Sequence, residues 1–273
     1  MYYRPSLFQQ AGIEAPPQTF EELLTTVETL KGAGLTPFTL GTKAPWPAAA
    51  WFDYLNMRTN GPEFHVQLTD GQAAYNSPEV KETFANWRRL LDAGAFIEQP
   101  EALEWQDALT PMLQGEAAMY LMGGFITDSM TAEQEQDLDF FSFPKIADVP
   151  VGEDAPTDGY FVAANARNVE EAKQFLAFVG GREHQEAAAR DPELARIAVN
   201  TQVPLDIYPP LVQKQVQMLQ AADYVAQFYD RDTAPEMADK GMAAFVQFMN
   251  QPDDVDLILD DLDEERKRIF ESE

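Results

Sequence analysis

The sequence contains no cysteine and only two histidines among its 273 residues. The lack of cysteine excludes disulfide frameworks, thiolate-bound zinc and thiol nucleophiles. His65 and His184 stand alone, so a multi-histidine metal site or a Ser-His-Asp catalytic triad has almost no residues from which to form. We therefore expect this chain to use no metal and no cofactor.

Basic residues are scarce, because 19 Lys and Arg face 46 Asp and Glu and leave a formal net charge of -27. Proteins bind phosphate groups largely through Lys and Arg, so nucleic acid and anionic membranes are poor partners for this chain. The acidic residues 253–265 could suggest a calcium loop, but the glycine and oxygen spacing of such a loop are missing. A solvated helical face is the better interpretation.

Long apolar runs are also lacking, since no stretch approaches the ~20 residues of a membrane span. Residues 1–5 show no basic segment followed by a long apolar one, so we expect no secretory signal in this chain. Hydrophobic residues make up 45% and aromatic residues 11% of the sequence. This is enough for a real core, so we expect one large or two modest folded domains.

Capping signals predict most of the helices. A helix is expected after each pair formed by a small polar residue and a glutamate three positions later, as in a capping box. These pairs are Thr19 with Glu22, Asn168 with Glu171 and Thr233 with Glu236. Further helices are expected over 78–93, 109–113 and 255–269, and apolar runs predict strands over 117–122, 140–144 and 160–163. Helices separated by short strands predict an α/β fold.

Several segments share motifs with one known family, in the same order along the chain. They are Tyr3–Phe8, Ala11–Ile13, Pro16–Leu23, Leu113–Phe125, Phe143–Pro144 with Asp158–Val162, and Asn168–Phe178. Together these segments resemble the bacterial extracellular solute-binding proteins, the sugar receptors of ATP-driven (ABC) importers. Within this family, the chain is similar to the maltose- and α-glucoside-binding proteins.

The resemblance implies a helix-rich periplasmic binding protein-like (type II) fold that is incomplete at the N-terminal lobe. Residues 1–143 with 203–273 would form the C-terminal lobe, and residues 144–202 a returning part of the N-terminal lobe. Members usually run to about 400 residues, the size of two full lobes. The chain is accordingly expected to be a truncated or split receptor, which binds sugar weakly or not at all alone.

The resemblance also implies a function. The chain would belong to a non-catalytic receptor that binds a mono- or oligosaccharide between two lobes and delivers it to the membrane permease of an ABC importer. Hinge closure would favour docking on that permease. The complete receptor would be a periplasmic monomer. Two other functions stay open: a glycoside hydrolase, which needs two carboxylates about 5–9.5 Å apart, and a protein-interaction module without sugar binding.

Aromatic residues are the first candidates for sugar contacts, because flat rings pack against the C–H face of a sugar. In the segment Gly41–Pro47, Trp46 stands between two prolines, and in the family this loop lines the cleft. Trp51 is a second candidate, and Gly124 with Phe125 follows an apolar strand where members often carry a sugar-stacking Trp. The alternatives are packing for the two tryptophans and a simple turn for Gly124 and Phe125.

Polar candidates would bind sugar hydroxyl groups. Asp158 precedes a predicted strand, and its alternative role is turn capping. Asp230 and Arg231 lie in a segment of mixed aromatic and charged residues, and they could instead pair with each other at the surface. Trp87 and Trp105 are assigned to packing, since Trp87 lies on a helical stripe and Trp105 begins a helix.

Overall fold

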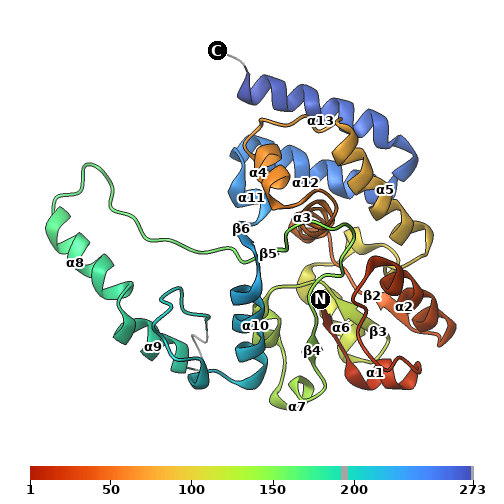
Figure 1. Ribbon diagram of the computed structural model, residues 1–273, viewed down its shortest axis with the longest axis horizontal. Helices are drawn as coiled ribbons and strands as arrows, with labels where there is room; N and C mark the ends of the chain where they lie inside the picture. The colour runs from red at the N-terminus through yellow and green to blue at the C-terminus, as the bar shows by residue number, and fades with distance from the viewer. Residues whose placement is uncertain (192–195, 272–273) are drawn as a thin grey trace. The chain divides into compact units, whose positions relative to one another are not determined.

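A computed structural model describes residues 1–191 and 196–271, and contacts between Cα atoms divide the chain into two compact units (Figure 1). Unit 1 comprises Met1–Asp154 with Ala222–Glu273, and unit 2 comprises Ala155–Ala221. The boundaries expected from the sequence, after residues 143 and 202, fall earlier than the observed ones. Unit 1 is therefore built from two separate stretches of the chain.

Four short strands form a sheet in unit 1, in the order β2-β3-β1-β4. The strands are β1 (Tyr2–Tyr3), β2 (Thr36–Phe38), β3 (Ala117–Tyr120) and β4 (Asp139–Phe140). β2 runs parallel to β3, whereas β1 runs antiparallel to both β3 and β4, with Tyr2 opposite Tyr120 and Phe140. All four residues of β3 are buried, as its interior position in the sheet requires.

A second, two-stranded sheet joins the two stretches of unit 1. Strands β5 (Gly152–Asp154) and β6 (Tyr224–Ala226) pair in parallel, with Glu153 opposite Val225. The strand expected over 160–163 is not observed. Tyr160 and Phe161 are 72% and 89% exposed, and no neighbouring strand pairs with this segment within the residues that the structure describes.

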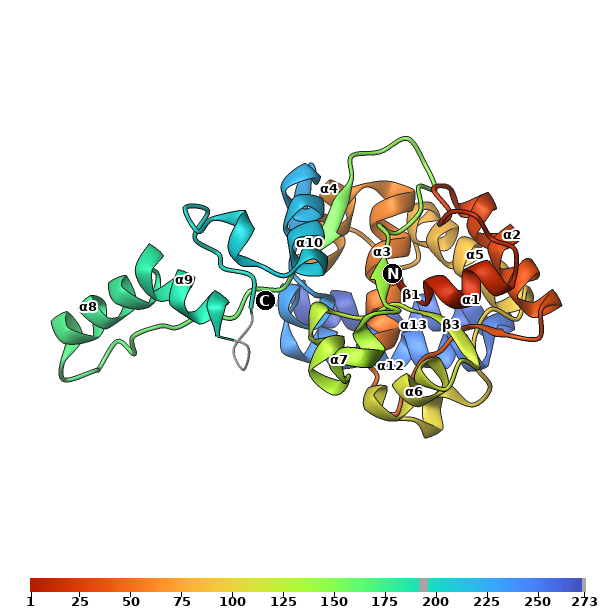
Figure 2. The same cartoon turned by 90° about the horizontal axis from the view of Figure 1, so that it is seen from below.

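Helices surround the sheets of unit 1, as Figures 1 and 2 show. They are α1 (Pro5–Gln10), α2 (Phe20–Gly32), α3 (Trp46–Asn60), α4 (Pro62–Thr69), α5 (Pro78–Asp92), α6 (Trp105–Leu113), α7 (Ala132–Glu135), α11 (Tyr229–Asp232), α12 (Pro235–Asn250) and α13 (Val255–Phe270), with the 3-10 turns η1 (Pro100–Ala102), η2 (Gly124–Ser129) and η4 (Pro252–Asp254). None of the helices in the described ranges combines the length and apolar composition that a membrane crossing requires.

Of the three predicted capping boxes, one is confirmed and two are wrong. The box at Thr19 is confirmed, since its side chain accepts from the Glu22 N–H and the Glu22 carboxylate accepts from the Thr19 N–H at 2.9 Å. The boxes at Asn168 and Thr233 are wrong. Asn168 makes no side-chain cap hydrogen bond, and the Thr233 hydroxyl instead donates to the carbonyl of Thr69 at 2.6 Å.

Helix α3 lies at the centre of unit 1, against α4, α5, α12 and β5 (Figure 1). It is buried on nearly all sides, from Pro47 to Arg58. The Phe52 ring stacks on the Phe245 ring of α12 with centroids 4.2 Å apart. Because α3 has little exposed surface, its polar side chains must find partners within the protein.

The ion pair between Arg58 and Glu153 fastens β5 to α3. The Arg58 Nη2 and Glu153 Oε1 atoms lie 2.6 Å apart, and the two side chains are 4% and 1% exposed. Arg58 also donates to the carbonyls of Phe143 and Gly152. All three nitrogen atoms of the guanidinium are thus engaged, as a buried charge requires.

Unit 2 contains α8 (Val169–Val179), α9 (Arg182–Arg190), the turn η3 (Leu205–Ile207) and α10 (Pro210–Ala221). None of the residues of α8 is buried, and its Phe175 and Phe178 are 56% and 59% exposed. A shallow hollow of about 280 Å³ lies between residues 160–166 and the apolar side of α8. Unit 2 therefore presents an apolar face instead of enclosing it.

We predict that Glu153→Ala destabilises the protein by roughly 3–5 kcal/mol, because it leaves the buried Arg58 charge without its counterion. Chemical denaturation followed by circular dichroism measures the change. Asp256→Ala is the matched control, since it breaks the ion pair of Lys81 and Asp256, whose side chains are 45% and 73% exposed. Equal losses for the two variants would contradict the structural role given to the Arg58–Glu153 pair.

Candidate functional site

Four aromatic side chains gather in unit 1 and form what we term the aromatic platform: Trp46, Trp105, Phe125 and Phe228. The ring centroid of Trp46 lies 6.4 Å from that of Trp105, 6.1 Å from that of Phe125 and 5.9 Å from that of Phe228. Trp105 and Phe125 are 5.2 Å apart in an edge-to-face arrangement. None of the four is fully buried, and Phe125 is 38% exposed.

The loop before α3 brings Trp46 and Trp105 together. The N–H groups of Thr42 and Lys43 donate to the carbonyls of Pro100 and Leu103 at 2.8 and 3.1 Å. A Cβ atom at Gly41 would lie 2.6 Å from the carbonyl oxygen of Glu104, so only glycine fits there without a shift of the backbone. Residue 105 begins α6 immediately after this contact.

Phe125 reaches the platform from η2, which follows strand β3. A Cβ atom at Gly123 would overlap the Phe125 ring. The lack of a side chain at Gly123 therefore lets the Phe125 ring lie close over the backbone. Gly124 is exposed at the start of η2.

The segment before α12 supplies Phe228 and the polar candidates. The Tyr229 N–H donates to the Asp53 carboxylate of α3 at 3.0 Å, and the Tyr229 hydroxyl bonds to the Tyr75 hydroxyl at 2.7 Å. These two buried anchors fix the residues on either side of Tyr229. Phe228 thereby contacts Trp46, while Asp230 lies two residues farther along the same segment.

Asp230 follows the platform residue Phe228 by two positions. It is half-buried, and its Oδ1 finds no hydrogen-bond donor within the described part of the chain. Burial raises the pKa of its carboxyl, and the neighbouring Arg231 guanidinium partly opposes that rise. Arg231 is exposed. The Oδ1 atom of Asp230 is shielded from solvent, and the sugar-binding role of Asp230 stays a prediction.

Two predicted site residues are corrected by the structure. Trp51 is 0% exposed and packs edge-on against Phe38 and Phe96, so it belongs to the core and offers no free ring face. Gly41 is buried against the backbone of residues 103 and 104. It shapes the platform from behind, and the prediction that it contacts the ligand is wrong.

Asp158 lies in unit 2 and is exposed, and its ligand role stays a prediction. Trp105 and Phe228 are platform residues that the sequence interpretation missed. For Phe228 the signal was present, since the sequence 227–232 mixes aromatic and charged residues. The position of Trp105 at the start of a helix led to the prediction that its side chain packs in the core. Trp87 is a core residue, as predicted.

A cavity of about 270 Å³ lies elsewhere in unit 1, lined by Gln18, Arg58, Ser142, Phe143, Lys145, Ala147, Val149 and Val151. Arg58 is the most polar buried group of its wall, but its guanidinium is fully engaged with Glu153, Phe143 and Gly152. The cavity therefore offers a ligand fewer free polar groups than its composition suggests.

A protein-family model matches more than half of the chain. The model of the bacterial extracellular solute-binding proteins matches residues 1–186. The chain belongs to this family. An uncharacterized ABC transporter extracellular-binding protein from Pyrococcus horikoshii is 26% identical over 228 residues, which are 82% of this chain and 49% of that protein. The chain thus spans about half the length of the curated relatives it matches.

Solved structures show the same fold. The bacterial solute receptor AcbH, described as preferring β-D-galactopyranose, has a TM-score of 0.85 and 29% identity, over 98% of this chain and 69% of that one. A chitin oligosaccharide binding protein has a TM-score of 0.83 and 20% identity, over 99% and 69% of the two chains. The chain therefore has the type II periplasmic binding protein fold, of class α/β.

We predict that Gly41→Ala destabilises this solute-binding chain by about 1–3 kcal/mol, because the added methyl group must displace the backbone of residues 103 and 104. Thermal unfolding measures the loss. Gly32→Ala is the matched control, since a Cβ atom at Gly32 would meet no atom within 4 Å, and we expect it to be neutral or slightly stabilising in its helix. A neutral Gly41→Ala would contradict the packing described for this loop.

Proposed function

We propose that this chain is part of a carbohydrate receptor of an ABC importer and that the aromatic platform is its sugar-binding surface. The observation that carries the proposal is the arrangement of Trp46 at the centre of three other rings, with Asp230 on the adjoining segment. Sugars are held by flat apolar faces together with fixed hydrogen-bonding groups, and the platform combines both.

The relatives support this proposal. The galactopyranose receptor and the chitin oligosaccharide binding protein have the same fold over nearly the whole of this chain. The family model describes solute-binding proteins, so we propose binding without chemical change to the sugar. In such a receptor, ligand binding favours the closed form, which delivers the sugar to a membrane permease outside the cell or in the periplasm.

We further propose that unit 1 is the C-terminal lobe and that unit 2 is a part of the opposite lobe. Unit 2 supports this assignment because the apolar residues of α8 and Tyr160 and Phe161 are left uncovered. The match to 69% of the galactopyranose receptor chain leaves room for further lobe structure in a complete receptor. With one lobe nearly absent, we expect weak sugar binding.

The test is a sugar titration of this chain followed by tryptophan fluorescence, with galactose, chitin oligosaccharides and α-linked glucose oligosaccharides. We expect a saturable change that Trp46→Ala and Phe125→Ala each weaken by about tenfold, which is ~1.4 kcal/mol of binding free energy. The reason is that each variant removes a ring from the surface on which the sugar packs.

Phe270→Ala is the matched control, because Phe270 of α13 is 36% exposed, close to the 38% of Phe125. It should leave the affinity unchanged. The proposal is contradicted if no sugar of the panel gives a change, or if the change is the same in wild type and Trp46→Ala.

A further inference from the structure

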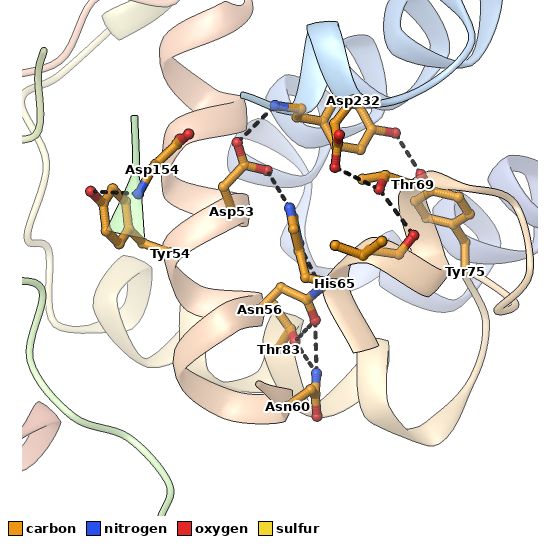
Figure 3. Close-up of polar contacts among 12 residues, drawn as sticks. Asp53, Tyr54, Asn56, Asn60, His65, Thr69, Tyr75, Thr83, Asp154 and Asp232 are labelled. Carbon is orange, nitrogen blue, oxygen red and sulfur yellow. Dashed lines mark hydrogen bonds and ion pairs between the residues drawn. The ribbon is translucent and has the colours of Figure 1, made fainter. Parts of the chain in front are cut away.

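Two carboxyl groups face each other inside unit 1 where the chain is about to leave it. Asp53 lies in the middle of α3 and is 0% exposed. Asp154 is the last residue of β5 and the last residue of unit 1 before unit 2 begins at Ala155. Figure 3 shows the Asp154 side chain directed toward the Asp53 carboxyl group, and each of the two carboxyl groups shifts the pKa of the other.

The carboxyl groups of Asp53 and Asp154 have few hydrogen-bond donors around them. Oδ2 of Asp53 accepts from the Tyr229 N–H at 3.0 Å, but Oδ1 of Asp53 and Oδ1 of Asp154 are shielded from solvent and meet no hydrogen-bond donor among residues 1–191 and 196–271. Two ionised carboxylates in such a place would repel each other. A single proton held between them would supply the missing donor and remove the repulsion.

The nearest candidate cation does not neutralise the pair. His65 Nε2 lies 3.6 Å from Asp53 Oδ1, and His65 is fully buried. The Asn56 amide oxygen accepts from Asn60 and Thr83, so its NH₂ group donates to His65 Nδ1 at 3.0 Å (Figure 3). That places the single proton of a neutral ring on Nε2. Burial lowers the pKa of His65 to about 4, so the ring is neutral at pH 7.

Acidic and aromatic groups surround the pair. The titratable and charged groups that face it are Tyr54 and Arg58 of α3, His65 of α4, Tyr75, Glu153 of β5, and Tyr229, Asp230 and Asp232 of α11. Arg58 is engaged by Glu153. Burial, together with the charges of Glu153, Asp230 and Asp232, raises the pKa of Asp154 to about 7, and burial raises the pKa of Asp53 well above its usual range.

We propose that Asp53 and Asp154 share one buried proton at neutral pH and act as a proton-operated clasp, which fastens the end of β5 to α3 when protonated and loosens it when ionised. Since Asp154 is the last residue before unit 2, the clasp controls the freedom of one of the two connections between the units. This inference goes beyond sugar binding and does not depend on it.

The direction of the pH dependence follows from the raised pKa. The ordinary pKa of Asp is about 3.9, so between about pH 4 and pH 7 the folded chain holds a proton that the unfolded chain has released. The stability contributed by the protonated pair is complete below about pH 4 and is lost as the pH rises through about 7. Asp154→Asn keeps a neutral donor beside Asp53 at every pH and should abolish this loss.

The experiment compares the thermal unfolding of the 273-residue chain and of Asp154→Asn at pH 5 and pH 8. We expect the melting temperature of the variant, relative to wild type, to be higher at pH 8 than at pH 5 by about 3 °C or more. Asp239→Asn, at an exposed position of α12, is the control and should show no such change. A relative melting temperature of Asp154→Asn that is the same at both pH values would overturn the proposal.

Infrared spectroscopy of the wild type gives a second readout that needs no variant to fold. A carbonyl band of a protonated carboxyl group should persist at pH 6, where exposed carboxyl groups are ionised, and weaken as the pH rises through about 7. A wild-type spectrum without this band at pH 6 would also overturn the proposal.

Discussion

The burial of helix α3 is the constraint on which the rest of unit 1 depends. A helix enclosed on nearly all sides cannot leave its polar side chains to water, so several of them bond to other segments. Arg58 selects Glu153 of β5, Asp53 selects the backbone of Tyr229, and Asn56 selects His65. The contacts of Arg58 and Asp53 join stretches of chain that are 95 and 176 residues apart in the sequence.

The candidate site follows from the same helix. Trp46 is the first residue of α3, and Asp53 lies two turns farther along it. Asp53 holds Tyr229, and the neighbouring Phe228 therefore meets Trp46. The buried polar contacts of α3 therefore determine where the rings of the partly exposed aromatic platform lie.

Local signals predicted the structure where the deciding contacts are local. The Thr19–Glu22 box and the serine cap of α5 depend on atoms within one helical turn, and both are present. The prolines on either side of Trp46 argue against a position in the middle of a helix, and Trp46 is the first residue of α3. Thr233 failed as a cap because its hydroxyl reaches the Thr69 carbonyl, which belongs to a distant segment. No pattern within residues 230–236 encodes that contact.

The difference between local contacts and contacts to distant segments also explains which site residues could be predicted from the sequence. Trp51 could not be told from a surface Trp, because α3 is buried on nearly all sides and its sequence lacks a polar face. Trp105 joins the platform through the contact of the Gly41–Lys43 loop with residues 100–104, which local spacing does not reveal. The resemblance of the 113–125 segment to the family, in contrast, indicated Phe125 directly.

The most direct test of the central claim is a nuclear magnetic resonance titration of the four tryptophan indole N–H signals with a sugar that binds the chain. Trp46 and Trp105 lie on the platform, whereas Trp51 and Trp87 are fully buried in the core of the same unit. The account predicts that the signals of Trp46 and Trp105 shift with added sugar and that those of Trp51 and Trp87 do not. Shifts confined to Trp51 and Trp87, or equal shifts in all four, would contradict it.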